Sequence, residues 1–339
     1  MTSLRNAILA TITYYDILEM PLTLLEVHSY LINPARFLVR KRAIGDISIF
    51  QIAKEMEQLC RINILEEING MYCLSGRRHI YKLRIGRQLL AAKKWKKFLR
   101  YVSWLSLVPY VRGVFASGSM ALNNTNLESD FDVLVVIQSG RLYSGRLILS
   151  AWTSLLGIRR TKDDLIAPDK LCFNHYITDG NLKINHESLF NASTYARLIP
   201  VKASNQIYFS FYDRNGWINQ YVYHFKPVAH FPKRQAKTYS WMEKIGRFGE
   251  SILDTWFGNV FEYISRWYQQ KRIRENPATY AQGGRIVFND SELEFHPYSF
   301  EAYLIGNYNS GLKKLGIMPF IEERDSGLLA GPISMMIAN

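Results

Sequence analysis

Cysteine is scarce in this sequence, and its scarcity excludes some classes of protein. Only three of the 339 residues are cysteines, Cys60, Cys73 and Cys172, and they lie far apart. A disulfide-stabilised scaffold or a structural zinc site would require closely spaced pairs of ligands. We therefore expect free thiols and a cytoplasmic protein.

Long apolar runs are also missing. The longest apolar stretch, Leu147 to Ile158, is too short to cross a bilayer. The first thirty residues contain Asp16, Glu19 and Glu26 and no uninterrupted apolar segment typical of a signal peptide. The sequence thus predicts a soluble chain without a transmembrane segment.

Acidic residues are outnumbered by basic ones, 29 against 42, which gives a formal net charge of +13. This excess favours polyanionic partners, namely nucleic acid, nucleotide phosphates or an acidic membrane surface. Apolar residues make up 48% of the chain and charged residues 21%, a balance typical of folded soluble proteins. The length exceeds one ordinary core, so we expect two or three domains.

The first 78 residues predict three helices and a hairpin. Apolar residues recur at three- and four-residue intervals from Leu4 to Tyr15, Thr23 opens a second helix with a capping box, and a third helix begins near Ser48. The dipeptide Asn69-Gly70 supplies the positive φ angles that a two-residue hairpin turn needs. This order predicts a winged-helix domain over residues 1–78.

Nucleic-acid binding by this domain stays an open alternative, because many winged helices only join domains. Its third helix carries Lys54 beside Glu55 and Glu57, with few side chains suited to reading bases. A long, basic helical pattern follows from Tyr81 to Leu107. Its lysines fit a solvated amphipathic face, a phosphate-facing surface or, around Lys93 to Lys97, attachment to an acidic membrane.

The most informative segment begins with a short buried strand at Val111 to Ala116. It runs into Gly118-Ser119, and after a polar stretch Asp130-Phe131-Asp132 opens a second apolar strand that ends at Ile137. Because side chains alternate along a strand, Asp130 and Asp132 are expected to point the same way.

Two carboxylates on one face repel each other unless a cation lies between them, and Mg²⁺ prefers oxygen ligands of this kind. We therefore predict that Asp130 and Asp132 bind Mg²⁺ and are catalytic. Gly118 lets the backbone approach a phosphate closely, and Ser119 offers a hydroxyl and free amides to a triphosphate.

A strand, Gly-Ser, about ten residues and then Asp-hydrophobic-Asp resembles the signature of the DNA polymerase β nucleotidyltransferase superfamily. The whole layout is similar to uncharacterised bacterial nucleotidyltransferase-domain proteins with an N-terminal winged helix. The resemblance implies that the two aspartates bind metal ions, that the Gly-Ser loop holds a nucleoside triphosphate, and that a third carboxylate on a later strand activates the acceptor.

The third carboxylate has no clear counterpart in this sequence. The strand expected to carry it, Leu171 to Ile177, has Asn174 and His175 as its candidate residues and contains no acid. The amide oxygen of Asn174 is a weak metal ligand, and His175 is a candidate general base. Four loop carboxylates nearby are further candidates: Asp163, Asp164, Asp169 and Asp179.

Together these features predict an α+β protein in three units. They are the winged helix (1–78), a nucleotidyltransferase α/β core with a small mixed sheet (79–200) and a mainly helical C-terminal domain (201–339). Apolar residues recur at helical intervals from Tyr239 to Arg274, which predicts a core-facing helix.

The predicted function is Mg²⁺-dependent transfer of a nucleotidyl group from a nucleoside triphosphate to an unidentified acceptor, with release of pyrophosphate. The alternative is a catalytically weak or inactive nucleotide-binding regulator with a DNA-binding winged helix.

Overall fold

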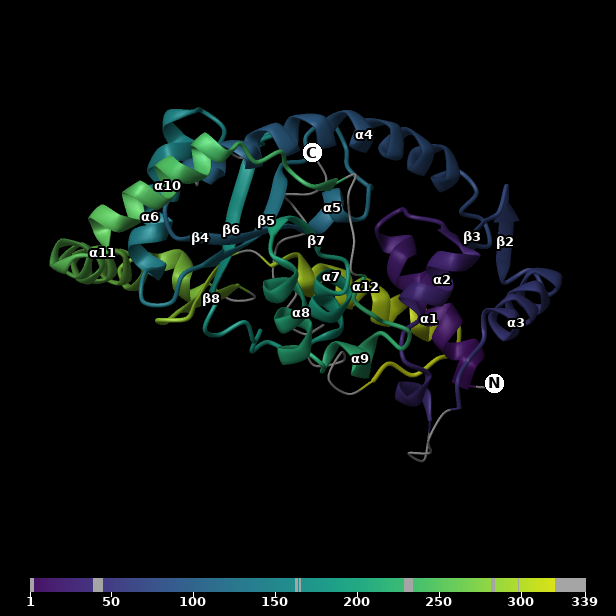
Figure 1. Ribbon diagram of the computed structural model, residues 1–339. Coiled ribbons are helices and arrows are strands. Elements are labelled where there is room, and N and C mark those ends of the chain that lie inside the picture. Colours follow the sequence, from purple (N-terminus) through teal and green to yellow (C-terminus); the bar gives the residue numbers. More distant parts are fainter. Residues whose placement is uncertain are drawn as a thin grey trace.

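The structure is a computed structural model that describes residues 3–38, 45–161, 164, 166–228, 234–281, 284–297 and 299–320. Helices surround one six-stranded mixed sheet, and a smaller three-stranded sheet lies near the N-terminus (Figure 1). The predicted α+β class and mixed sheet are confirmed. Among the described residues, no helix is long and apolar enough to span a bilayer.

The N-terminal unit contains the expected helices and hairpin. The Thr23–Glu26 capping box is present, and a second one joins Ser48 to Gln51. The hairpin turns at Asn69 and Gly70, both with positive φ, and an additional short strand extends the sheet in the order β1-β3-β2. The elements are α1 (Ser3–Ile17), β1 (Leu22–Thr23), α2 (Leu24–Tyr30), η1 (Pro34–Phe37), α3 (Ile49–Arg61), β2 (Leu65–Ile68) and β3 (Met71–Leu74).

A long helix, α4 (Ile80–Trp104), runs from this unit along the central sheet (Figure 1). The sheet has the order β7-β4-β5-β6-β9-β8, in which β5 and β6 are parallel and every other neighbouring pair is antiparallel. Its strands are β4 (Val111–Ala116), β5 (Phe131–Ile137), β6 (Leu171–Thr178), β7 (Ile199–Ala203), β8 (Arg285–Phe288) and β9 (Glu292–His296).

Alternation along β5 divides the hydrophobic core into two. Phe131, Val133 and Val135 pack with Trp95 and Phe98 of α4 on one face of the sheet. Leu134 and Val136 pack on the opposite face, where apolar residues of α1 and α12 join them in a single cluster. The face that carries Leu134 and Val136 therefore looks towards the N-terminal unit.

The remaining helices cover the two faces and the ends of the sheet. The strand β9 was not predicted from the sequence; it places a C-terminal segment between β6 and β8, so the sheet draws on residues beyond 201. The helices are η2 (Leu105–Leu107), α5 (Gly118–Ala121), α6 (Leu142–Leu155), α7 (Leu189–Tyr195), α8 (Asn205–Arg214), α9 (Ile218–Tyr221), α10 (Ser240–Leu253), α11 (Trp256–Arg274), η4 (Pro277–Tyr280) and α12 (Phe300–Lys314).

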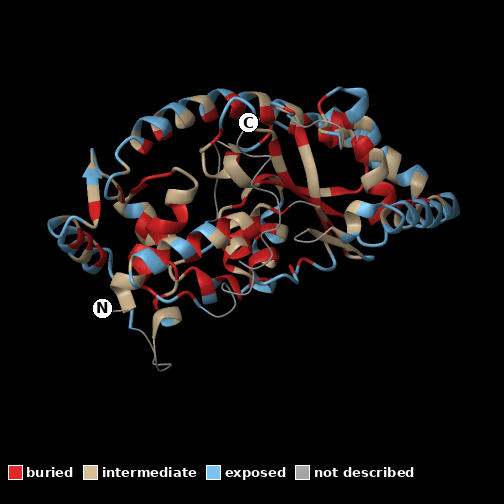
Figure 2. Cartoon of the chain, turned by 180° about the vertical axis from the view of Figure 1, so that it is seen from behind, coloured by how far each residue is buried: buried red, intermediate tan, exposed pale blue. Residues whose placement is uncertain are grey.

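The prediction of a core-facing helix between Tyr239 and Arg274 is wrong. The segment forms two helices, α10 and α11, and the apolar residues with helical spacing point into solvent. Phe248 is 67% exposed and Trp256 is 65% exposed. Figure 2 shows these helices as largely exposed ribbons at one end of the molecule. The periodicity identified the helices correctly but not the side that packs, because the contacts with the body of the protein are made by other residues, among them Met242, Gly246 and Glu250.

Candidate functional site

The Gly118 loop lies against the carboxylate of Asp132. Strand β4 ends at Ala116, the backbone N–H of Ser117 donates to the Asp132 carbonyl at 3.0 Å, and α5 begins at Gly118. Gly118 has φ +56°, and a Cβ atom there would lie 2.5 Å from Asp132 Oδ2. A side chain at this position would strain the backbone and displace the Asp132 carboxylate, so glycine is favoured on both counts.

The two predicted acids converge. Asp132 lies in β5, and Asp130 is the residue just before that strand. By alternation both side chains point to the same face of the sheet as Leu134, which is the face towards the N-terminal unit. One carboxylate oxygen from each aspartate and the Cys172 thiol lie within 4.8 Å of one another. Within the described residues, this group contains no third carboxylate.

Burial and the neighbouring Asp130 charge raise the pKa of Asp132 to about 7, against the opposing effects of Arg160 and Asn174. A carboxylate in this position is short of positive charge, and a divalent cation would supply it. Burial and the two aspartates also raise the pKa of the Cys172 thiol well above its usual value, so Cys172 is a neutral thiol at neutral pH. The hard oxygen donors, rather than the sulfur, suit Mg²⁺.

Two polar side chains hold the carboxylates in place. Arg160 Nη1 donates to Asp130 Oδ2 at 2.6 Å. Asn174 Nδ2 donates to Asp132 Oδ1 at 3.2 Å. Asn174, one of the two candidates for the third-carboxylate position, therefore does reach the site, as an amide donor to the acid.

His175, the other candidate, borders the cavity but is almost fully buried. Its Nδ1 lies 2.7 Å from the Tyr195 hydroxyl, and its Nε2 lies 3.1 Å from Glu292 Oε1. The side chain is 4% exposed. Both ring nitrogens thus have protein partners, which ties His175 to β9 more directly than to the aspartates.

The loop carboxylates considered as substitutes are engaged elsewhere. Asp164 accepts from the Thr161 backbone, Asp169 pairs with Lys94 and Lys97, and Asp179 accepts from the Ser139 backbone. Asp163 lies outside the described residues.

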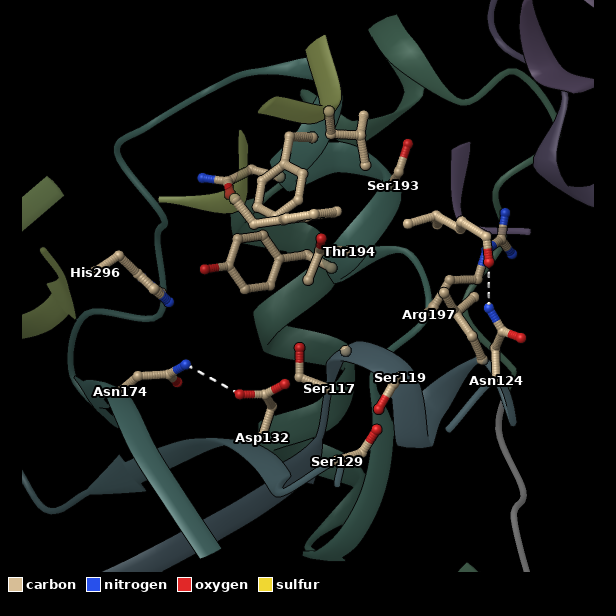
Figure 3. A pocket seen from close by; sticks show the side chains of 18 of the residues that line it. Ser117, Ser119, Asn124, Ser129, Asp132, Asn174, Ser193, Thr194, Arg197 and His296 are labelled. Carbon is tan, nitrogen blue, oxygen red and sulfur yellow. Dashed lines mark hydrogen bonds between the residues drawn. The ribbon is translucent and has the colours of Figure 1, made fainter. Parts of the chain in front are cut away.

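The site opens into a cavity of about 650 Å³ between the sheet, α1, α7 and α12. In Figure 3, Asp132, Asn174, Ser117 and Ser119 lie on one side of it, and Thr194 of α7 lies across from them. The N-terminal unit forms part of the wall through residues from Tyr14 to Glu19. A volume of this size accommodates a small molecule such as a nucleotide.

Four arginines also line the cavity, and sequence reasoning did not single them out. They come from separate elements and border the same cavity only in the fold: Arg87, Arg160, Arg197 and Arg285. Three of them also pair with carboxylates: Arg87 with Glu19, Arg160 with Asp130, and Arg285 with Glu294 and Glu301. A guanidinium group binds phosphate well because its planar donors match the oxygens of the anion. The sequence offered one indication of a basic cavity wall, the basic character of α4. That character did not distinguish Arg87 from the other basic residues of the helix.

Comparisons with protein-family models, with curated proteins and with solved structures find no match to this chain. The assignment of a function therefore depends on the site itself.

Proposed function

We propose that this chain is a Mg²⁺-dependent nucleotidyltransferase of the polymerase β type, with a winged helix preceding its catalytic core. It would transfer a nucleotidyl group from a nucleoside triphosphate to an acceptor and release pyrophosphate. The observation that carries the proposal is the convergence of Asp130 and Asp132, with the Asp132 carboxylate packed against Gly118.

The residues present fit a magnesium ion. Asp130 and Asp132 offer hard oxygen donors whose mutual repulsion and burial leave a deficit of positive charge. Bound Mg²⁺ would neutralise phosphate charge and stabilise the attacking and leaving oxygens of an in-line displacement.

The chain itself would bind and orient the triphosphate. The first N–H groups of α5 have no acceptor within the helix, and Gly118 lets them approach a phosphate. The Ser119 hydroxyl lines the same cavity. Arg160 supplies positive charge beside Asp130, and Asn174 holds Asp132 by its amide. Positioning and charge would supply most of the rate enhancement.

The direct test uses Asp130→Asn combined with Asp132→Asn, with labelled nucleoside triphosphates and Mg²⁺. We expect label transfer and pyrophosphate release to fall by at least ~100-fold, because both metal ligands are lost. Asp213→Asn, an exposed acid on α8, is the matched control and should leave turnover unchanged. Full activity in the double variant would exclude this site.

A nucleotide-binding regulator is the second candidate, and it is favoured by the amide of Asn174 where the resemblance implies a carboxylate. Such a protein would bind nucleotide without turnover and bind duplex DNA with a steep salt dependence. Asn174→Asp separates the two functions. If the wild type binds nucleotide but is inactive and Asn174→Asp is active, the regulator is supported; turnover by the wild type supports the enzyme.

A further inference from the structure

Helices α10 and α11 both expose large apolar side chains, which together form what we call the apolar band. On α10, Trp241, Ile245, Phe248 and Ile252 are spaced by four, three and four residues, which confines them to a strip roughly 60° wide at about 100° per residue. On α11 the band continues through residues that are 44% to 71% exposed: Trp256, Phe257, Val260, Tyr263, Ile264, Trp267 and Tyr268. So large an exposed apolar surface is typical of an interaction site.

The opposite sides of these helices explain why the band faces outward. Gly246 packs so closely that a Cβ would lie 2.7 Å from the Ser106 carbonyl oxygen. Glu250 accepts from the Tyr110 backbone at 2.6 Å and pairs with Arg112 at 2.7 Å. These close polar contacts fix α10 with its small and acidic side against the protein.

Helix α11 is fixed in the same way. Glu262 accepts from the backbone N–H of Tyr143 at 3.0 Å and of Ser144 at 2.8 Å. Gln269 Nε2 donates to the Tyr143 carbonyl at 2.8 Å. Glu250 and Glu262 thus hold the two helices against the body of the protein, and the aromatic residues remain exposed at the surface.

Exposed basic residues outnumber exposed acidic residues on these helices. Between residues 240 and 275, all of which the structure describes, the exposed acids are Asp254 and Glu275, at the ends of the helices. The exposed bases lie beside or at the end of the apolar band: Lys244, Arg247, Arg266, Lys271, Arg272 and Arg274. Two of them pair with exposed acids, Arg266 with Asp290 and Lys271 with Glu275, and the surface keeps a basic excess. The complementary partner is therefore an anionic surface that also accepts apolar groups.

We propose that α10 and α11 bind the surface of an anionic lipid bilayer, with the apolar band inserted among the lipids and the basic residues at the headgroups. Tryptophan and tyrosine favour the boundary between headgroups and acyl chains, and flanking bases add attraction to anionic lipids. The helices lie along the membrane surface and do not span it.

Two other binding partners fit the apolar band less well than a bilayer does. In a symmetric contact with a second copy, this basic surface would face its own like charges. Single-stranded nucleic acid would use the aromatic rings for stacking, but Ile245, Ile252 and Ile264 offer no ring. A bilayer satisfies both the aliphatic and the aromatic members of the band.

The test is flotation of the full chain with vesicles of phosphatidylcholine alone and of an equimolar mixture with phosphatidylglycerol. We expect binding to the mixed vesicles, and Phe248→Ala with Trp256→Ala should weaken it at least ~tenfold because apolar insertion is lost. The matched control is Phe50→Ala with Leu89→Ala, two residues that are 76% and 65% exposed on other helices; it should bind like the wild type. Thermal unfolding verifies that each variant is folded.

Charge variants test whether the basic residues of α10 contact anionic headgroups. Lys244→Glu with Arg247→Glu should abolish the preference for anionic vesicles, whereas Lys93→Glu with Lys96→Glu on α4 should retain it. The proposal is overturned if the wild type does not bind mixed vesicles, if both apolar pairs bind equally, or if the α4 charges are the ones required. Self-association or DNA binding that depends on Phe248 and Trp256, without vesicle binding, would also overturn it.

Discussion

At the scale of single residues, Gly118 and Asp132 restrict each other. The positive φ of Gly118 turns the chain at the end of β4, and the missing side chain leaves space for the Asp132 carboxylate. Gly118 therefore has a specific structural task here, which is to let the loop after β4 lie directly against the Asp132 carboxylate.

Gly118→Ala should strongly reduce nucleotidyl transfer while the fold persists. The added methyl group would displace the Asp132 carboxylate, and the left-handed conformation costs an alanine roughly 1–2 kcal/mol. We expect activity and Mg²⁺-dependent nucleotide binding to fall by at least ~100-fold, since Asp132 is moved from its position. Steady-state kinetics and calorimetric titration measure the two effects.

Gly140→Ala is the matched control for this change. Gly140 has φ +75°, and a Cβ atom there would meet nothing within 4 Å. It carries the same backbone strain without the collision, so it should lose stability but retain transfer. Equal loss of activity in both variants would show that strain alone is responsible.

Arg160→Gln should change the affinities for metal and nucleotide in opposite directions. Arg160 is a cation 2.6 Å from Asp130, so it competes with a metal ion but attracts a triphosphate. We expect Mg²⁺ or Mn²⁺ alone to bind roughly threefold to tenfold tighter, and nucleotide to bind more weakly. Titration calorimetry with each ligand measures this. Arg159→Gln, one residue away, is the control, and equal affinities in both variants would contradict a role for Arg160.

At the scale of elements, β9 and α12 are joined to the body of the protein by buried charges. Arg285 on β8 pairs with Glu294 of β9 at 2.6 Å and with Glu301 of α12 at 2.7 Å. Burial alone would raise the pKa of Glu301, but His186, Ser188 and Arg285 together lower it to about 2. Glu301 therefore stabilises the fold in its ionised form.

This network predicts sensitivity to acid. Because the folded-state pKa of Glu301 lies below the unfolded value near 4.5, its contribution is complete above about pH 4.5 and is lost as pH falls towards 2. The loss amounts to about 3 kcal/mol. Denaturant unfolding from pH 7 to pH 2 should show a shallower acid dependence in Glu301→Gln than in the wild type. Glu187→Gln, near the surface, should leave the dependence unchanged.

At the scale of the whole molecule, one apolar cluster links segments that the sequence assigns to three domains. It contains Ile8 of α1, Leu134 of β5 and Tyr308 of α12, and the cavity wall also combines α1 with the sheet. Units that share a core in this way are expected to unfold together.

We therefore predict a single cooperative transition, which scanning calorimetry would test, with a calorimetric enthalpy equal to the van't Hoff enthalpy. Separate transitions for residues 1–78, 79–200 and 201–339 would instead support three independent domains. Hydrogen exchange would then identify which segment opens first.

The sequence by itself determined the local elements and the central motif. Capping residues at Thr23 and Ser48, the Asn69-Gly70 turn and the apolar strands on either side of Gly118 act through short-range sterics and hydrogen bonds, so they can be read from neighbouring residues. Alternation along β5 also indicated that Asp130 and Asp132 share a side.

Only the tertiary structure decided what surrounds that motif and which faces are covered. Arg160 reaches Asp130, α1 forms part of the cavity wall, and β9 enters the sheet through contacts between residues far apart in the chain. The band on α10 and α11 makes the same point, because helical periodicity reveals an apolar side but not what that side contacts. Packing of Gly246 and Glu250 against the body of the protein settled that choice.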